Sequence, residues 1–202
     1  MYDCLGYVKT CTVLPGLIYG IAQTRLVSLG IQNSRSQQIQ AMIDAGIDRH
    51  QGGVIGKGIN IWSHVHIQDL ACLYMHIFDA AICSCRLYVG RIGMYFAENG
   101  ECEIGEISQA VAKELSARGC GRHYPTVFTQ AEMEKYTFVS HRNMMSDSDL
   151  TGFQTRMLGG NVRARGERAR SIGWKPVHGM QSMLASIRDE VAVSMGTMEA
   201  NL

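Results

Sequence analysis

The sequence predicts an α/β protein in which buried strands alternate with amphipathic helices. Residues 60–67 alternate in polarity as a strand does, and residues 70–81 then repeat apolar side chains at helical spacing. Residues 10–18 are apolar and β-branched and run into Pro15-Gly16, which is typical of a buried parallel strand that enters a loop. A chain of 202 residues with 46% hydrophobic residues can bury one sizeable core, or one core with a small lobe.

The remaining elements follow in chain order. Residues 34–45 predict a helix that ends at Gly46, since glycine commonly closes a helix. Residues 52–58 predict a short strand and a glycine turn. The Gly-x-Gly of this turn precedes a strand, whereas a phosphate-binding loop precedes a helix. We therefore interpret it as a hairpin turn.

The second half of the chain continues the pattern with one strand and several helices. A strand is expected at residues 93–97, and helices are expected at 103–117, 132–135, 147–157 and 180–191. The arginine-rich run at 163–170 lacks interleaved aromatic residues and predicts a solvated helix face, not a nucleic-acid site. Trp174 is expected in the core.

Composition excludes several classes of function. The net charge of +1 supplies no field that would attract nucleic acid or an anionic membrane. No apolar run approaches the ~20 residues that cross a bilayer, and the N-terminus lacks the features of a signal peptide. The seven cysteines are odd in number and scattered, so free thiols in a cytoplasmic protein are expected.

One side of the strand at 60–67 is unusually polar. It carries Asn60, Trp62, His64 and His66, a set that favours the wall of a ligand cleft over a packing surface. Two histidines two residues apart bind zinc only with a third ligand, which the sequence does not place. Satisfied surface histidines are the alternative to cleft-wall residues. Asp69 is interpreted as a helix-start residue without a chemical role.

Four segments in the right order resemble one family. Residues 65–71, VHIQDLA, resemble the VH(V/I)-x-DLA segment of the NAD(P)-dependent epimerase/dehydratases, which are extended short-chain dehydrogenase/reductases. The other segments are VLPGLIYG at 13–20, YFAENG at 95–100 and ARSIGWKP at 169–176. The resemblance is to a fungal-type, reductase-like member.

This resemblance implies the C-terminal portion of a Rossmann-type fold with a small α/β substrate-binding lobe, forming one region over residues 1–202. It implies NAD or NADP as cofactor and a small carbonyl or hydroxyl compound as substrate. Trp62 stands where sugar-nucleotide enzymes carry basic residues, which suggests a less charged substrate. The residues expected to contact the cofactor are Leu14, Pro15, Gly16, Leu17 and Ile18. The residues expected to contact the substrate are Tyr19, Asn60, Trp62, His64 and His66.

The sequence departs from the family in two motifs. It contains no Gly-x-x-Gly-x-x-Gly turn, and Tyr2, Tyr7 and Lys9 do not have the spacing of the Tyr-x-x-x-Lys pair. We therefore expect the N-terminal dinucleotide-binding half to be absent and the chain to be impaired or inactive alone. A non-catalytic binding or regulatory fragment and an incomplete gene model are the alternatives. Loss of neighbouring strands would also expose an apolar sheet edge, with self-association as one consequence.

Overall fold

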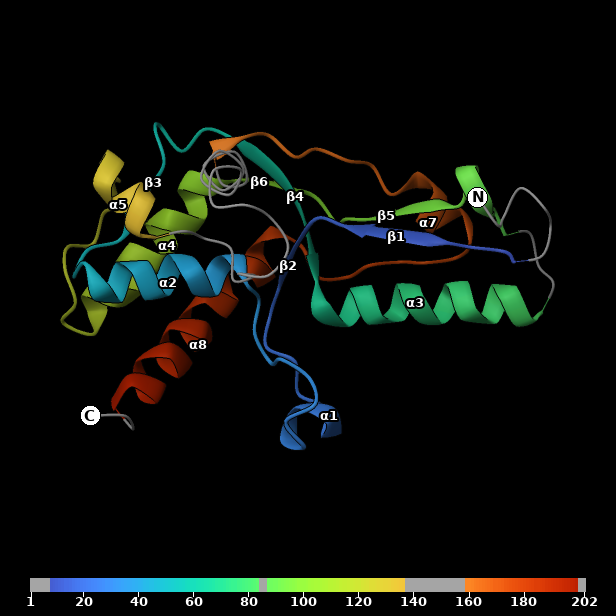
Figure 1. Cartoon of the computed structure of the whole chain (residues 1–202), viewed down its shortest axis with the longest axis horizontal. Coiled ribbons are helices and arrows are strands. Elements are labelled where there is room, and N and C mark those ends of the chain that lie inside the picture. The colour runs from blue at the N-terminus through green and yellow to red at the C-terminus, as the bar shows by residue number, and fades with distance from the viewer. Residues whose placement is uncertain (1–7, 84–86, 137–158, 200–202) are drawn as a thin grey trace.

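The computed structural model describes residues 8–83, 87–136 and 159–199. Figure 1 shows an elongated molecule in which β1, β5, α3 and α7 lie at one end, while α2, α4, α5 and α8 lie at the other. The helix expected at 147–157, together with Tyr2 and Tyr7, lies outside the described residues. None of the described helices combines the length and apolarity needed to cross a membrane.

The strands form short, mostly parallel ladders. Their bounds are β1 Thr12–Pro15, β2 Leu17–Tyr19, β3 Gly53–Val54, β4 Ile61–His66, β5 Met94–Ala97, β6 Glu101–Glu103 and β7 Thr126–Val127. Strand β1 pairs in parallel with β5, β2 with β4, and β3 with β7, whereas β6 is antiparallel to β4. The predicted α/β class is confirmed by this arrangement.

The helices cover these ladders. They are α1 Arg25–Ser28, α2 Gln38–Asp48, α3 Ile67–Ile82, α4 Ile104–Ala117, α5 Gln130–Lys135, α7 Glu167–Ser171 and α8 Met180–Glu199, with a 3-10 turn, η2, at Gly90–Ile92. Helix α3 begins earlier than its apolar repeat indicated, because the His66 side chain accepts a hydrogen bond from the backbone N–H of Gln68 and so caps the helix at Ile67.

Two sequence expectations about glycine are wrong. Helix α2 continues past Gly46 to Asp48, and His50 takes the positive φ of 51° after it. Gly46 is instead a contact position, because an added Cβ would lie 2.6 Å from Cδ1 of Leu115. The glycine turn at 56–58 is present, but it does not close a hairpin, since β3 pairs with β7 and not with β4.

Two hydrophobic cores meet along β4. The first core joins β2, α2, α4 and α8 and includes Trp62 of β4. The second joins α3, β5 and α7 and includes Val65 of β4 together with Trp174, which is buried as expected. Because the opposite faces of one strand contribute to different cores, β4 ties the two ends of the molecule together.

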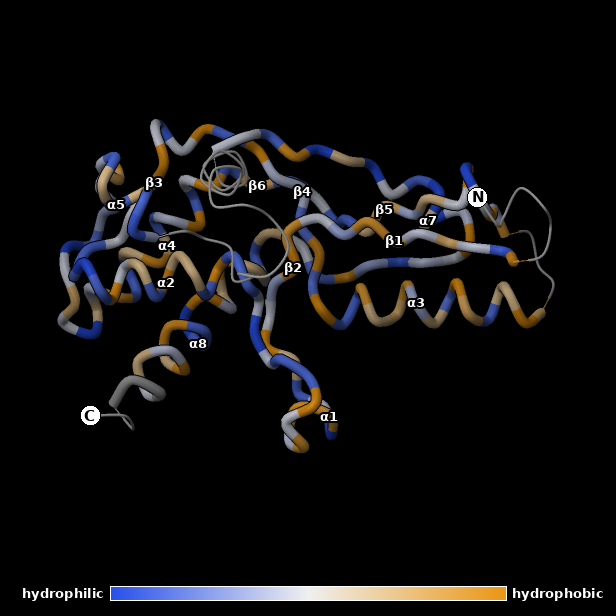
Figure 2. The backbone as a smooth tube through the Cα atoms, viewed as in Figure 1, coloured by the Kyte–Doolittle hydropathy of each residue, from blue (hydrophilic) through white to orange (hydrophobic). Residues whose placement is uncertain are grey.

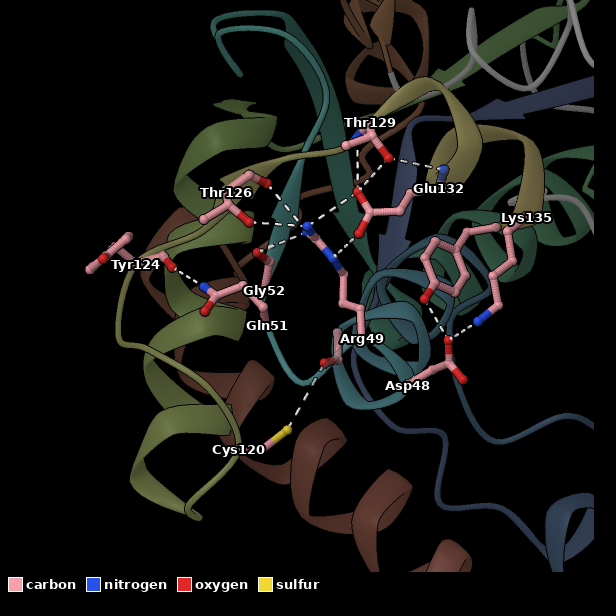
Figure 3. A network of polar contacts seen from close by, with 12 residues as sticks. Asp48, Arg49, Gln51, Gly52, Cys120, Tyr124, Thr126, Thr129, Glu132 and Lys135 are labelled. Atoms are coloured by element: carbon pink, nitrogen blue, oxygen red, sulfur yellow. Dashed lines mark hydrogen bonds and ion pairs between the residues drawn. The ribbon is translucent and has the colours of Figure 1, made fainter.

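A half-buried arginine, Arg49, fixes α5 at the first end, as Figure 3 shows. The Arg49 guanidinium forms a two-pronged ion pair with Glu132, with Nε 2.9 Å from Oε1. It also donates to the backbone oxygens of Gly52 and Thr126 and lies over the ring of Phe128. One side chain therefore joins α2, β3, β7 and α5.

The arginine-rich run is only in part the solvated helix face that its sequence predicted. Arg163, Arg165 and Arg170 are exposed, as expected. Only the second half of the run is helical, in α7, and three arginines also contact the protein. Arg163 pairs with Glu101, and Arg170 pairs with Glu98 at 2.5 Å. Arg168 donates to backbone oxygens of η2 and β5. These contacts hold the segment against the sheet.

Candidate functional site

The segment expected to contact a cofactor runs from the end of β1 through Gly16 into β2, and is called the Pro15 loop below. Pro15 is exposed, Leu14, Gly16 and Ile18 are half-buried, and Leu17 is fully buried in the first core. Gly16 donates to Ala97 O at 3.0 Å, which carries the chain from one ladder to the next. The loop thus lies at the carboxyl ends of β1 and β5, the rim where open parallel sheets bind ligands.

Gly16 has a packing role in addition to the cofactor contact predicted for it. An added Cβ would lie only 2.3 Å from the backbone oxygen of Ser63. The glycine is therefore needed for close approach of β4. Leu17 is fully buried, so Pro15 is the most accessible of the predicted cofactor residues.

The polar side of β4 does not form an open cleft wall. Trp62 is 5% exposed, and its indole Nε1 donates to Gly160 O at 2.9 Å. Asn60 is half-buried and donates to the same oxygen at 3.0 Å. His64 is fully buried. The expectation of a cleft wall is corrected here because residues beyond 159 return to cover this face.

Four aromatic rings gather where the two cores meet. The Tyr19 ring packs edge-on against His64 and His66, with centroids 5.6 and 5.0 Å away, and its hydroxyl donates to Gly179 O. His66 stacks on His178 at 4.1 Å. The structure thus brings three predicted substrate residues together and adds His178, which no sequence motif indicated. The sequence feature that could have indicated it is the His178-Gly179 pair, which follows the Trp-Lys-Pro motif by one residue and for which no role was predicted.

Asp69 has a structural role beyond the start of α3. Its Oδ2 accepts from the backbone N–H groups of Val177 and His178, at 3.1 and 2.9 Å, and its backbone oxygen accepts from Trp174. The His178 Nδ1 lies 3.1 Å from the same Oδ2, a contact that becomes an ion pair when the ring is protonated. The carboxylate therefore positions the 174–178 segment against β4.

His64 is the most unusual of these groups. Among the described residues neither ring nitrogen has a hydrogen-bond partner. Burial lowers the pKa of His64, and nearby Glu98 only partly offsets this. Burial would raise the pKa of Glu98, but hydrogen bonds from Gly100, Gly166 and Arg170 outweigh it and lower that pKa. The imidazole is thus neutral beside an anchored carboxylate.

His66 is likewise held neutral. Burial lowers its pKa, the neighbouring His178 lowers it further, and Asp69 opposes both effects. Because Nδ1 accepts from the Gln68 N–H, the neutral ring carries its proton on Nε2. That nitrogen faces Gly20, where an added Cβ would lie 2.4 Å away.

The cluster is not arranged for metal binding or for proton transfer by tyrosine. Within the described ranges, no three His, Cys, Asp or Glu side chains are placed to hold a metal ion. Burial, with a further effect from Asp69, raises the pKa of Tyr19 above its ordinary value. A tyrosine that exchanges a proton with a substrate near neutral pH needs a lowered pKa. Tyr19 is accordingly a buried hydrogen-bond donor.

Comparison with known proteins agrees with the fold. No protein-family model matches the sequence. The oxidase ucsJ of Acremonium sp is 26% identical over 179 residues, which cover 84% of this chain and 46% of that protein. An epimerase from Methanothermobacter thermautotrophicus matches 98% of this chain and 48% of its own, with TM-score 0.57 and 11% identity. Pal from Bacillus thuringiensis matches 95% and 48%, with TM-score 0.54 and 11% identity.

A UDP-glucose 4-epimerase from Bifidobacterium longum, solved with NAD+ and UDP, matches 90% of this chain and 47% of its own, with TM-score 0.51 and 12% identity. The chain spans about half the length of each of these proteins. Its parallel ladders and helices have the fold of the C-terminal half of Rossmann-type epimerase/dehydratase structures.

Proposed function

We propose that this chain is the substrate-side part of an NAD(P)-dependent oxidoreductase that acts on a small carbonyl or hydroxyl compound. The observation that carries the proposal is the exposed Pro15 loop at the carboxyl rim of β1 and β5, in a fold shared with epimerases. The bound NAD+ of the Bifidobacterium epimerase supports the cofactor class. The nicotinamide would accept or donate the hydride when bound.

The chain's own residues would bind and orient ligands. Pro15 and the backbone of its neighbours are the accessible groups for the nicotinamide end of a dinucleotide. His66 and His178 are half-buried, whereas Tyr19 and His64 are closed off. We therefore assign polar contacts with the substrate to these two half-buried imidazoles. The dinucleotide cradle and the proton-transfer pair would be supplied by sequence outside this chain.

The test is nuclear magnetic resonance titration of the labelled chain with nicotinamide mononucleotide and with AMP. If the loop meets the nicotinamide end, the mononucleotide shifts the amide signals of Leu14, Gly16 and Ile18, and AMP leaves them unchanged. Thermal shift with NAD, NADH, NADP and NADPH gives a second readout, because ligands that bind the native state raise the melting temperature. Unchanged loop signals at millimolar nicotinamide mononucleotide would contradict the proposal.

A non-catalytic ligand-binding role is the second candidate. It is favoured by the absence of a Tyr-x-x-x-Lys spacing in the sequence and by the raised pKa of Tyr19. The two functions differ in turnover. A binding module would respond to nicotinamide ligands at the loop, yet would not oxidise NADH when combined with a dinucleotide-binding half and a carbonyl substrate.

A further inference from the structure

The β1–β5 ladder packs one face on the second core, while side chains on its other face are partly exposed. Tyr95 and Ala97 of β5 are buried in the second core. On the opposite face, Thr12 lies beside Met94 and Leu14 beside Phe96. Met94 is 45% exposed and Phe96 is 39% exposed. Parallel strands are almost always covered on both faces, so this apolar face is an unfinished packing surface.

Helix α3 carries a second apolar surface. Its buried apolar side chains are Leu70, Leu73 and Ile77, which belong to the second core. Tyr74 and Phe78, at the next positions in the helical repeat, are more than half exposed, and so is Ile82. In Figures 1 and 2, α3 runs beside the β1–β5 ladder with hydrophobic residues along its length. Exposed apolar patches of this kind mark interaction sites.

The edge of β1 away from β5 is the third surface. Among the described strands β1 pairs with β5 alone. Thr12 and Gly16 donate to carbonyls of the β5 side, so by strand alternation the peptide groups of Val13 and Pro15 face the other way. Proline has no N–H, which leaves Val13 as the donor on this edge. Apolar burial would therefore supply most of the binding free energy.

We propose that the β1 edge, the Leu14–Phe96 face and the outer side of α3 form one docking surface for a parallel α/β unit carried by other sequence. Such a unit would add a strand beside β1 and place helices on both faces. A second copy related by a two-fold axis would pair the edges in antiparallel fashion and bring α3 against α3, yet would leave the Leu14–Phe96 face uncovered. Only the α/β partner covers all three surfaces.

The length comparison supports the same occupant. Each matched structure is about twice as long as the segment that this chain covers. The inference goes beyond cofactor use, since it concerns a surface for assembly, and binding at that surface is measured without any nucleotide. Failure of docking is thus distinguishable from failure of the nicotinamide titration.

The experiment is co-expression of the full chain with the part of the Acremonium oxidase outside its match to this chain, followed by co-purification and sedimentation. We expect a one-to-one complex. Phe78→Glu and Phe96→Glu each place a charge in the surface and should weaken binding at least tenfold. Ile59→Glu, at an exposed apolar residue in the turn before β4, is the matched control and should bind as the parent does.

Three results would overturn the proposal. The first is no complex. The second is a complex that survives both surface substitutions. The third is a stable homodimer of the chain alone that Phe78→Glu dissociates and Phe96→Glu does not, since this would make a second copy the occupant.

Discussion

Glu190 is a fully buried carboxyl group in α8, and its replacement gives the sharpest test of the packing at the first end of the molecule. Its oxygens have only long contacts, with the Gly20 N–H at 3.4 Å and the Ser36 hydroxyl at 3.5 Å. Burial raises the pKa of Glu190 to about 7, and these contacts and Arg35 offset burial only in part. The folded chain therefore holds this proton up to neutral pH.

The raised pKa of Glu190 makes the folding stability depend on pH. The folded pKa is above the ordinary value of 4.5, so the stabilisation is complete below pH 4.5 and is lost as pH rises through 7. The difference between the folded and the ordinary pKa corresponds to about 3 kcal/mol of folding free energy lost at alkaline pH. Glu190→Gln keeps the shape and has no charge to lose, so its stability relative to the parent should rise by about 2 to 3 kcal/mol between pH 5 and pH 8.

Urea denaturation of the parent and of Glu190→Gln at several pH values measures this difference directly. Asp189→Asn is the matched control, because Asp189 is the preceding residue and is exposed. The control should differ from the parent by the same amount at every pH. If Glu190→Gln also gives a constant difference from pH 5 to pH 8, the carboxyl group is not held protonated by burial and the reasoning fails.

Three further substitutions test the junction and its support. His64→Phe should remove a loss of stability on acidification. Burial lowers the His64 pKa below its ordinary 6.5, so the parent loses the stability contributed by the neutral ring as pH falls below 6.5. Denaturation at pH 7 and at pH 5 measures this loss. Arg49→Ala leaves Glu132 without its half-buried partner and removes hydrogen bonds to Gly52 and Thr126, so it should cost about 1 to 2 kcal/mol, with faster amide exchange in α5. Gly16→Ala should cost about 2 kcal/mol or more by pushing β4 away, while Gly179→Ala, with open space around its Cα, should change stability by less than about 1 kcal/mol in the same denaturation assay.

Local pattern predicted the elements well where one strand or helix determines its own periodicity. Residues 60–67 alternate, and β4 is present there at Ile61–His66. The same alternation misled the assignment of its polar side. A polar strand face next to a helix start forms a cleft wall only if no other segment covers it. The segments that cover this face of β4 are distant in sequence. Trp62 donates to Gly160 O, 98 residues away, and His66 stacks on His178.

The contacts of the aromatic cluster also could not be predicted from local sequence. Asp69 was interpreted as a helix-start residue, which is correct for its place in the first turn of α3. Its contacts with Val177 and His178 depend on a return of the chain that no local pattern encodes. The hydroxyl of the buried Tyr19 likewise depends on Gly179, whose backbone oxygen accepts its hydrogen bond. Sequence thus identified the participants at β2 and β4 but not the segment that closes over them.

The β1 edge of the docking surface and the exposed Pro15 belong to the same strand, and this links the two proposals physically. Parallel neighbours end at the same rim of a sheet, so a strand added beside β1 would finish next to Pro15. Groups that follow such a strand would then face the loop from the side opposite β5. The closed face of β4 could not receive them, since Trp62 and His64 are buried. A nucleotide held by the added unit would therefore meet this chain first at Pro15, and the half-buried His66 and His178 would lie on the substrate side of that contact.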